Sequence, residues 1–172
     1  MCIKEDPTTQ VISLRAASPE DEPFLAAVYA STREAELALV DWTDEQKSAF
    51  LQMQFDAQHR YYHEHYRDTS WDVVLLDGEP IGRLYVARWP EEIRIVDIAL
   101  LPGHRGSGIG SRLIGELLRE AEDANKPLRI HVEQYNPAIR LYERLGFTPI
   151  GRHGVYILMQ RVPAPSSAAS LS

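Results

Sequence analysis

The sequence predicts an α/β fold, because strand-like and helix-like segments follow one another along its 172 residues. Apolar and polar residues alternate at 11–15 and 128–133, as they do in strands that bury one face. Apolar residues recur at helical spacing within 19–38 and after Ser111, as they do in helices that bury one side. The predicted order is strand, two helices, three strands, helix, strand, helix and two strands.

The first two helices have recognisable starts. Ser18 followed by Pro19 and acidic residues predicts a helix from about 19 to 38. Thr43 with a glutamine three residues later is typical of a capping box and predicts a second helix that runs to about Tyr66.

The second helix carries two groups of candidate site residues. Gln54 and Gln58 lie one turn apart beside aromatic residues such as Tyr62, so these three are candidates for lining a substrate pocket, although such stripes more often pack in a core. The same helix carries three histidines, which are His59, His63 and His65. No cysteine, clustered acid or H-E-x-x-H pattern completes a ligand set, so we expect no metal site.

The three central strands are expected at 71–77, 80–88 and 93–100. Asp77-Gly78 between the first two is typical of a tight hairpin. After a further helix and strand, 147–151 and 155–162 predict a closing hairpin around Arg152-His153-Gly154.

A glycine loop separates the strand at 93–100 from the helix that begins near Ser111. Glycines at 106, 108 and 110 let the backbone approach a ligand closely, because no Cβ stands in the way. The helix directs its unpaired N–H groups and the positive end of its dipole into this loop. Such an arrangement binds anions, usually a phosphate or pyrophosphate. The sequence therefore predicts a phosphorylated cofactor.

Two common phosphate motifs do not match this loop. A Walker loop requires lysine where Ile109 stands, which disfavours a nucleotide-dependent kinase, and a dinucleotide fingerprint requires glycine where Ser111 stands. The pattern Arg105-x-x-Gly108-x-Gly110 instead resembles the acetyl-CoA-binding motif of the GNAT superfamily of N-acetyltransferases. Asn136-Pro-Ala-Ile-Arg-Leu-Tyr142-Glu-Arg-Leu-Gly-Phe147 resembles the second landmark of that superfamily, and the resemblance extends over about 11–161.

The resemblance implies the GNAT fold, a mixed central sheet of six to seven strands flanked by about four helices. It also implies an enzyme that moves an acetyl group from acetyl-CoA to a primary amine of a small molecule or peptide, by direct attack in a ternary complex. We expect one domain over 1–162 and a disordered tail over 163–172, which is rich in proline, serine and alanine. Dimers are common in the superfamily, so a second copy of the chain is a candidate partner.

The resemblance further assigns cofactor contacts to individual positions. Backbone groups of the central strand would hold the pantetheine arm, and the loop would hold the pyrophosphate. The expected cofactor-binding residues are Ile98, Ala99, Leu100, Arg105, Gly106, Ser107, Gly108, Ile109, Gly110, Ser111, Asn136, Ala138 and Tyr142. Ser107 stands where many members carry a lysine or arginine, so one positive charge near the pyrophosphate is absent.

Catalysis requires a base for the amine and an acid for the departing thiolate. Asp97 matches the strand position where many members carry a catalytic carboxylate, whereas Glu133, His131 and water are alternatives. Tyr142 matches the tyrosine whose hydroxyl protonates the thiolate, and a phenol and a thiol titrate close enough for that transfer. A coenzyme A-binding sensor without turnover is the alternative function.

Composition restricts the remaining possibilities. The formal net charge of -7 argues against nucleic acid as a partner and fits an amine substrate. Cys2 is the single cysteine, so no internal disulfide can form and a reducing compartment is expected. No signal-peptide core and no run of about 18 apolar residues occurs, so we expect a cytoplasmic protein without a membrane contact.

Overall fold

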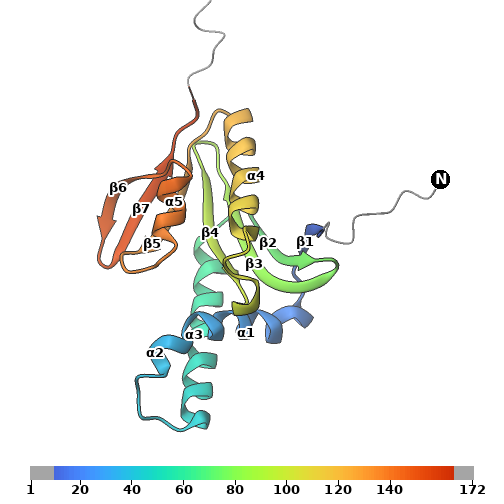
Figure 1. The fold of residues 1–172 in the computed structure, drawn as a ribbon, viewed down its shortest axis with the longest axis vertical. Coiled ribbons are helices and arrows are strands. Elements are labelled where there is room, and N and C mark those ends of the chain that lie inside the picture. Colours follow the sequence, from blue (N-terminus) through green and yellow to red (C-terminus); the bar gives the residue numbers. More distant parts are fainter. Residues whose placement is uncertain (1–9, 165–172) are drawn as a thin grey trace, which may run out of the picture.

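The computed structural model describes residues 10–164, in which one seven-stranded sheet has the order β1-β2-β3-β4-β5-β7-β6. The strands are β1 (Ile12–Ala16), β2 (Thr69–Leu76), β3 (Glu79–Arg88), β4 (Ile93–Leu100), β5 (Leu128–Glu133), β6 (Thr148–His153) and β7 (Tyr156–Arg161). Neighbouring strands are antiparallel except β4 and β5, which are parallel. The predicted mixed sheet is confirmed, and Figure 1 shows β1 and the β6–β7 hairpin at its opposite ends.

Helices cover both faces of the sheet. They are α1 (Glu22–Thr32), α2 (Glu34–Leu37), α3 (Asp44–His65), α4 (Ile109–Asp123) and α5 (Ile139–Arg144). Residues of α4 and α5 share the larger core with β3, β4 and β5, whereas Leu25, Tyr29, Phe55 and Val73 form a smaller core beneath α1 and α3. No helix among residues 10–164 is both long and apolar enough to cross a membrane.

The helix expected over 19–38 is divided into three pieces. A 3₁₀ turn at Pro19–Asp21 precedes α1, and Arg33, with φ -110° and ψ 0°, separates α1 from the single turn of α2. The hydroxyls of Ser31 and Thr32 donate to the carbonyls of Val28 and Tyr29. Hydroxyls that bond the preceding turn compete with the helical backbone, which explains the interruption.

Other element ends follow their local signals. Thr43 caps α3 through a capping box with Gln46, and Asp77 and Gly78 have the positive φ angles of a two-residue hairpin turn. In the closing hairpin, β6 extends two residues beyond its expected end, to His153, so the turn consists of Gly154 and Val155. The expected tail from residue 165 onward and Cys2 lie outside the described residues.

The parallel strands β4 and β5 pair over three residues and then separate. Ile93, Arg94 and Ile95 pair with Leu128, Arg129 and Ile130, and beyond them β4 pairs only with β3. A bulge at Val96 interrupts the β3–β4 register, since Tyr85 pairs with Asp97 and Val86 with Ile95. Because a bulge adds one residue to the alternation, Asp97 faces α3 although Ile95 belongs to the core beneath α4.

Gly82 allows β3 to approach the end of β4. An added Cβ there would overlap the carbonyl oxygen of Ala99 and lie 2.8 Å from Cδ2 of Leu100. We predict that Gly82→Ala lowers the free energy of unfolding by ~2 kcal/mol, because the strands must move apart. Urea unfolding measures this change.

Gly115→Ala is the matched control for this prediction. Gly115 lies within α4, and an added Cβ there meets no atom within 4 Å. Alanine has a higher helix propensity than glycine, so this change should raise the free energy of unfolding by ~0.5–1 kcal/mol. Equal effects of the two substitutions would contradict the close approach at Gly82.

Candidate active site

The glycine loop leads directly into the N-terminus of α4. Gly106 and Gly108 have φ angles of 72° and 87°, a region that glycine enters without strain. Helix α4 begins at Ile109, two residues before the expected start at Ser111, and the N-cap position is Gly108, with no side chain to cap it. Within residues 10–164, the amides from Gly106 to Ser111 donate to no backbone carbonyl. These amides and the dipole of the 15-residue α4 fit an anionic ligand.

The side chains of the loop bind the protein itself. Arg105 donates from Nε to the carbonyl of Leu100 at 2.9 Å and from Nη2 to the hydroxyl of Ser31 at 3.1 Å. Ser107 donates to the carbonyl of His104 at 3.1 Å. Arg105 therefore ties the loop to β4 and α1, and the backbone amides are the groups left to face a ligand.

The start of α5 is shaped by Asn136. Its side-chain oxygen accepts a hydrogen bond from the amide of Ala138 at 2.9 Å, and its carbonyl accepts one from Ile139 at 3.1 Å. Two of the expected cofactor-binding residues, Asn136 and Ala138, thus contact each other. The carboxamide nitrogen of Asn136 is the part of that side chain left for a ligand.

Tyr142 is held in place by the way in which α5 ends. Gly146, with φ 90°, lets the amide of Phe147 donate to the carbonyl of Tyr142 and its own amide donate to Glu143, which is a Schellman motif. The Phe147 ring packs edge-on against Tyr142, with centroids 5.7 Å apart, and Tyr142 is 4% exposed. Burial raises the pKa of the Tyr142 phenol, and the negative charge of Asp97 raises it further. The phenol is therefore a protonated group at neutral pH.

Asp97 belongs to a hydrogen-bonded cluster beneath α3. Arg83 donates from Nη2 to Oδ2 of Asp97 at 2.7 Å, and the hydroxyl of Tyr62 donates to the same oxygen at 3.0 Å. Arg83 Nη2 also donates to Oε1 of Gln58 at 2.9 Å. Gln54, the remaining pocket candidate on α3, has no hydrogen bond to this cluster within the described residues.

Arg83 is the member of this cluster that the sequence analysis missed. It is 2% exposed and lies in a strand that is otherwise largely apolar. An arginine in such a strand needs a buried acid as its partner, and this requirement could have indicated a buried ion pair from the sequence. The sequence does not show which acid meets it, because Asp97 reaches that face only through the bulge.

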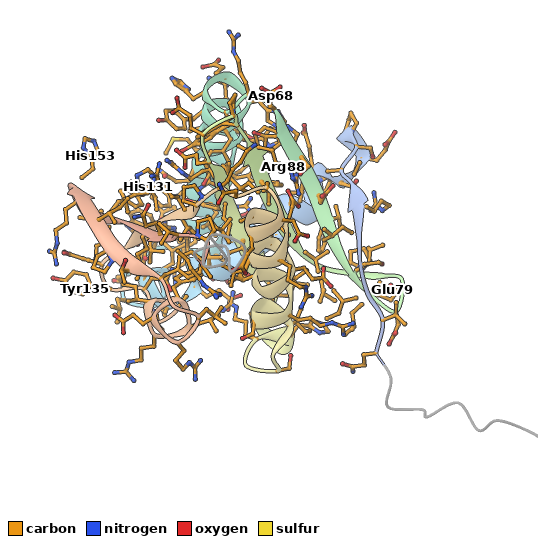
Figure 2. The ribbon with its side chains drawn as sticks, turned by 90° about the horizontal axis from the view of Figure 1, so that it is seen from above. Asp68, Glu79, Arg88, His131, Tyr135 and His153 are labelled. Atoms are coloured by element: carbon orange, nitrogen blue, oxygen red, sulfur yellow. The ribbon has the colours of Figure 1, made fainter. Side chains whose placement is uncertain are left out.

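The side chains of Glu133 and His131 lie on the same face of the sheet as α1 and α3. Glu133 pairs with Arg33 at 3.4 Å, and His131 contacts Arg94 at 3.2 Å. Burial and the charge of Arg94 lower the pKa of His131. Figure 2 shows His131 and Tyr135 at the end of the sheet opposite Glu79. The expected alternation in β5 is confirmed, since Leu128, Ile130 and Val132 are buried in the other core.

The histidines of α3 pack against aromatic rings. The ring centroids of His59 and His63 are 4.4 Å apart, and His63 stacks on Trp71 at 4.0 Å. His65 stacks on Tyr61 at 4.1 Å. Across residues 10–164, no group of three or more His, Cys, Asp or Glu residues is arranged to hold a metal ion.

A mixed sheet in which two parallel strands separate, followed by a glycine loop and a helix without an N-terminal cap, is typical of N-acetyltransferase folds. The chain belongs to the acetyltransferase (GNAT) family, whose model matches residues 35–147. The fold is similar to that of the PaiA N-acetyltransferase of Thermoplasma acidophilum in complex with coenzyme A. The TM-score is 0.66 at 17% identity, over 88% of this chain and 99% of that one. An acetyltransferase of Thermus thermophilus gives a TM-score of 0.63 at 22% identity, over 88% and 96% of the two chains.

Sequence relatives match over shorter stretches. A mycothiol acetyltransferase of Nocardiopsis dassonvillei is 39% identical over 86 residues, which is 48% of this chain and 23% of that protein. A streptothricin acetyltransferase of Streptomyces lavendulae is 37% identical over 86 residues, which is 45% and 43% of the two proteins. The chain thus spans less than half the length of both relatives.

The buried ion pair predicts a large effect of Asp97→Asn on stability. The substitution leaves the guanidinium of Arg83, whose side chain is 3% exposed, without its counter-charge. We expect the free energy of unfolding to fall by ~3 kcal/mol in urea unfolding at neutral pH. Glu36→Gln makes the same chemical change in the more exposed Arg33–Glu36 pair and should cost less than ~1 kcal/mol. Similar losses in both variants would contradict the structural role of the Arg83–Asp97 pair.

Proposed function

We propose that this protein transfers an acetyl group from acetyl-CoA to a primary amine by direct attack within a ternary complex. The observation that carries this proposal is one juxtaposition: unpaired amides at the start of α4, a strand pair that separates, and the buried phenol of Tyr142. Family membership supports it, as does the structural neighbour that was crystallised with coenzyme A.

The residues present fit the cofactor. The amides from Gly106 to Ser111 would hold the pyrophosphate, and backbone groups of Ile98, Ala99 and Leu100 would hold the pantetheine arm where β4 is no longer paired with β5. The carbonyl of Leu100 already accepts from Arg105, so its second lone pair is the one available. When bound, acetyl-CoA supplies an acetyl group that is already activated as a thioester.

Tyr142 is the proposed acid. Its phenol stays protonated at neutral pH and can donate its proton to the departing thiolate. Asp97 is the first candidate for taking the proton of the amine. Arg83 and Tyr62 both donate to its Oδ2, and within the described residues Oδ1 accepts no hydrogen bond, so Oδ1 is the oxygen available to the amine. Glu133, His131 or a water molecule are the other candidates for the base.

The acceptor is proposed to be a small-molecule or peptide amine. The related proteins include acetyltransferases named for mycothiol, for streptothricin and for an alanine of ribosomal protein bS18, so both acceptor classes are included. The net charge of -7 fits a cationic amine in solution. A single cysteine in the sequence fits a reducing compartment, and we propose the cytoplasm.

A coenzyme A sensor without turnover is the alternative function. The loop and the separated strands would serve a sensor equally well. The protonated phenol of Tyr142 and the carboxylate of Asp97 favour the enzyme, because cofactor binding alone requires neither group. Thiol release from acetyl-CoA across a panel of primary amines tests the two, since a sensor would bind the cofactor in calorimetry and release no thiol with any amine.

Tyr142→Phe should reduce kcat by about 100-fold or more, because the proton for the thiolate is lost. The affinity for acetyl-CoA in calorimetry should change less than about twofold, since the ring and its packing against Phe147 remain. Tyr61→Phe, a change at an exposed tyrosine of α3, is the matched control and should leave kcat unchanged. An unchanged kcat in Tyr142→Phe would remove the acid role.

The raised pKa of Tyr142 predicts the shape of the pH profile. The working form is the protonated phenol, and a pKa above the usual value of about 10 keeps it protonated throughout the neutral and mildly alkaline range. We therefore expect kcat to show no alkaline decline below about pH 10 that follows tyrosine ionisation. A decline near pH 8 that coincides with tyrosinate absorbance, and that Tyr142→Phe removes, would contradict this assignment.

A further inference from the structure

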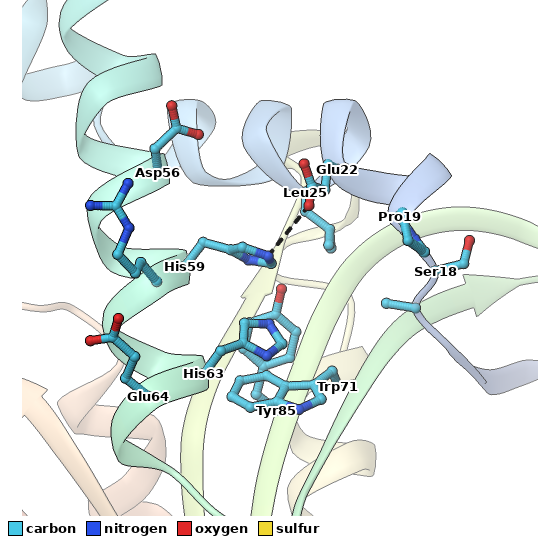
Figure 3. Close-up of a pocket in the computed structure, with 12 residues that line it drawn as sticks. Ser18, Pro19, Glu22, Leu25, Asp56, His59, His63, Glu64, Trp71 and Tyr85 are labelled. Atoms are coloured by element: carbon cyan, nitrogen blue, oxygen red, sulfur yellow. Dashed lines mark ion pairs between the residues drawn. The ribbon is translucent and has the colours of Figure 1, made fainter.

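A cavity of about 620 Å³ lies in the corner between α1, α3 and β2. Figure 3 shows His59 and His63 projecting into it from α3, with Trp71 and Tyr85 beneath them. Its size falls within the roughly 300–1,000 Å³ of small-molecule sites. Its lining residue Tyr85 pairs with Asp97 in the sheet, but none of its lining residues belongs to the glycine loop, β4, β5, α4 or α5. The cavity therefore adjoins the proposed acetyl-transfer site and shares no residue with it.

The floor of the cavity holds a buried polar atom that has no partner. Tyr85 is 1% exposed and lines the cavity, yet within the described residues no group has hydrogen-bond geometry to its hydroxyl. The guanidinium of Arg83 also acts on this hydroxyl, and Asp97 balances the charge of that guanidinium. Figure 3 shows this hydroxyl directed up between the α3 histidines and Leu25. An unsatisfied buried hydroxyl costs free energy, and a ligand that donates to its oxygen would reduce that cost.

The walls of the cavity combine aromatic rings with net negative charge. Trp71, stacked on His63, and Tyr85, edge-on to Trp71 with centroids 5.0 Å apart, form a continuous aromatic surface. The cavity is lined by three carboxylates, those of Glu22, Asp56 and Glu64, and by one guanidinium, that of Arg60. Burial and nearby His59 lower the pKa of His63, so its ring carries little positive charge at neutral pH.

These features favour one chemical class of ligand. Carboxylates at the opening attract a cation, and aromatic faces stabilise a cation or a flat apolar ring. An ammonium group has three donors, so one N–H can reach the oxygen of Tyr85 while others face Glu22, whose carboxylate lies 3.6 Å from His59. We infer that this cavity is a second binding site, for a primary ammonium ion attached to a flat apolar ring. The inference does not depend on acetyl transfer.

The test is calorimetric titration of the full chain with tryptamine, in the absence of acetyl-CoA. Tryptamine should bind, whereas 3-indolepropionate, which has the same ring system and the opposite charge, should not. Tyr85→Phe should weaken binding about tenfold, because a hydrogen bond to a charged donor is lost. Glu22→Gln should weaken it about threefold, since that carboxylate is largely exposed and screened by solvent.

Two controls separate this site from other causes. Tyr61→Phe, outside the cavity lining, and Tyr142→Phe, in the proposed transfer site, should both leave tryptamine affinity unchanged. Tyr85→Phe should unfold at the same temperature as the wild type or higher, because the hydroxyl that is removed has no hydrogen-bond partner among residues 10–164. The inference is overturned if tryptamine gives no binding heat, if 3-indolepropionate binds equally well, or if Tyr142→Phe weakens binding while Tyr85→Phe does not.

Discussion

Every residue of a strand brings an N–H and a C=O that need partners, and β4 loses its partner β5 after Ile95. From Asp97 to Leu100 it is paired on the β3 side alone, so alternate residues direct their backbone groups into the gap. The loop from Gly106 to Ser111 adds a second set of amides close by in the chain, which donate to no backbone carbonyl of the described part of the protein. A ligand with a polar arm and an anionic end can satisfy both sets, which a continued sheet could not do.

The two faces of the sheet contribute different chemistry to this gap. Tyr142 comes from the apolar core beneath α4 and α5, and burial keeps its phenol protonated. Asp97 comes from the other face, where Arg83 and Tyr62 hold it in a polar cluster beneath α3. A buried phenol held by apolar packing and a carboxylate held by an ion pair therefore come from opposite faces of the sheet, and the charge of Asp97 raises the pKa of Tyr142. Helix α3 contributes to both the polar cluster and the cavity, because Tyr62 contacts Asp97 while His59 and His63 line the cavity.

Local sequence signals predicted those elements whose ends are determined locally. The cap at Thr43 and the turn at Asp77-Gly78 lie where expected, and the glycine loop joins a strand to a helix as the sequence indicates. The helix expected over 19–38 was too long, because hydroxyls near its end compete for backbone carbonyls. The cluster around Arg83 was not predicted, since it depends on a bulge that has no local signature. The roles assigned to Asp97, Glu133 and the cofactor-binding residues remain predictions.

The bulge at Val96 makes the side of the sheet that Asp97 faces depend on the number of residues in β4. Without the bulge, a strand with the same number of residues would follow simple alternation, which would place the carboxylate of Asp97 in the apolar layer that contains Ile93 and Ile95. Arg83 would then be left as an isolated cation on the opposite side of the sheet. A protein engineer who straightens this strand must therefore also delete one residue, because a straight strand of unchanged length would reverse which layer carries the charge.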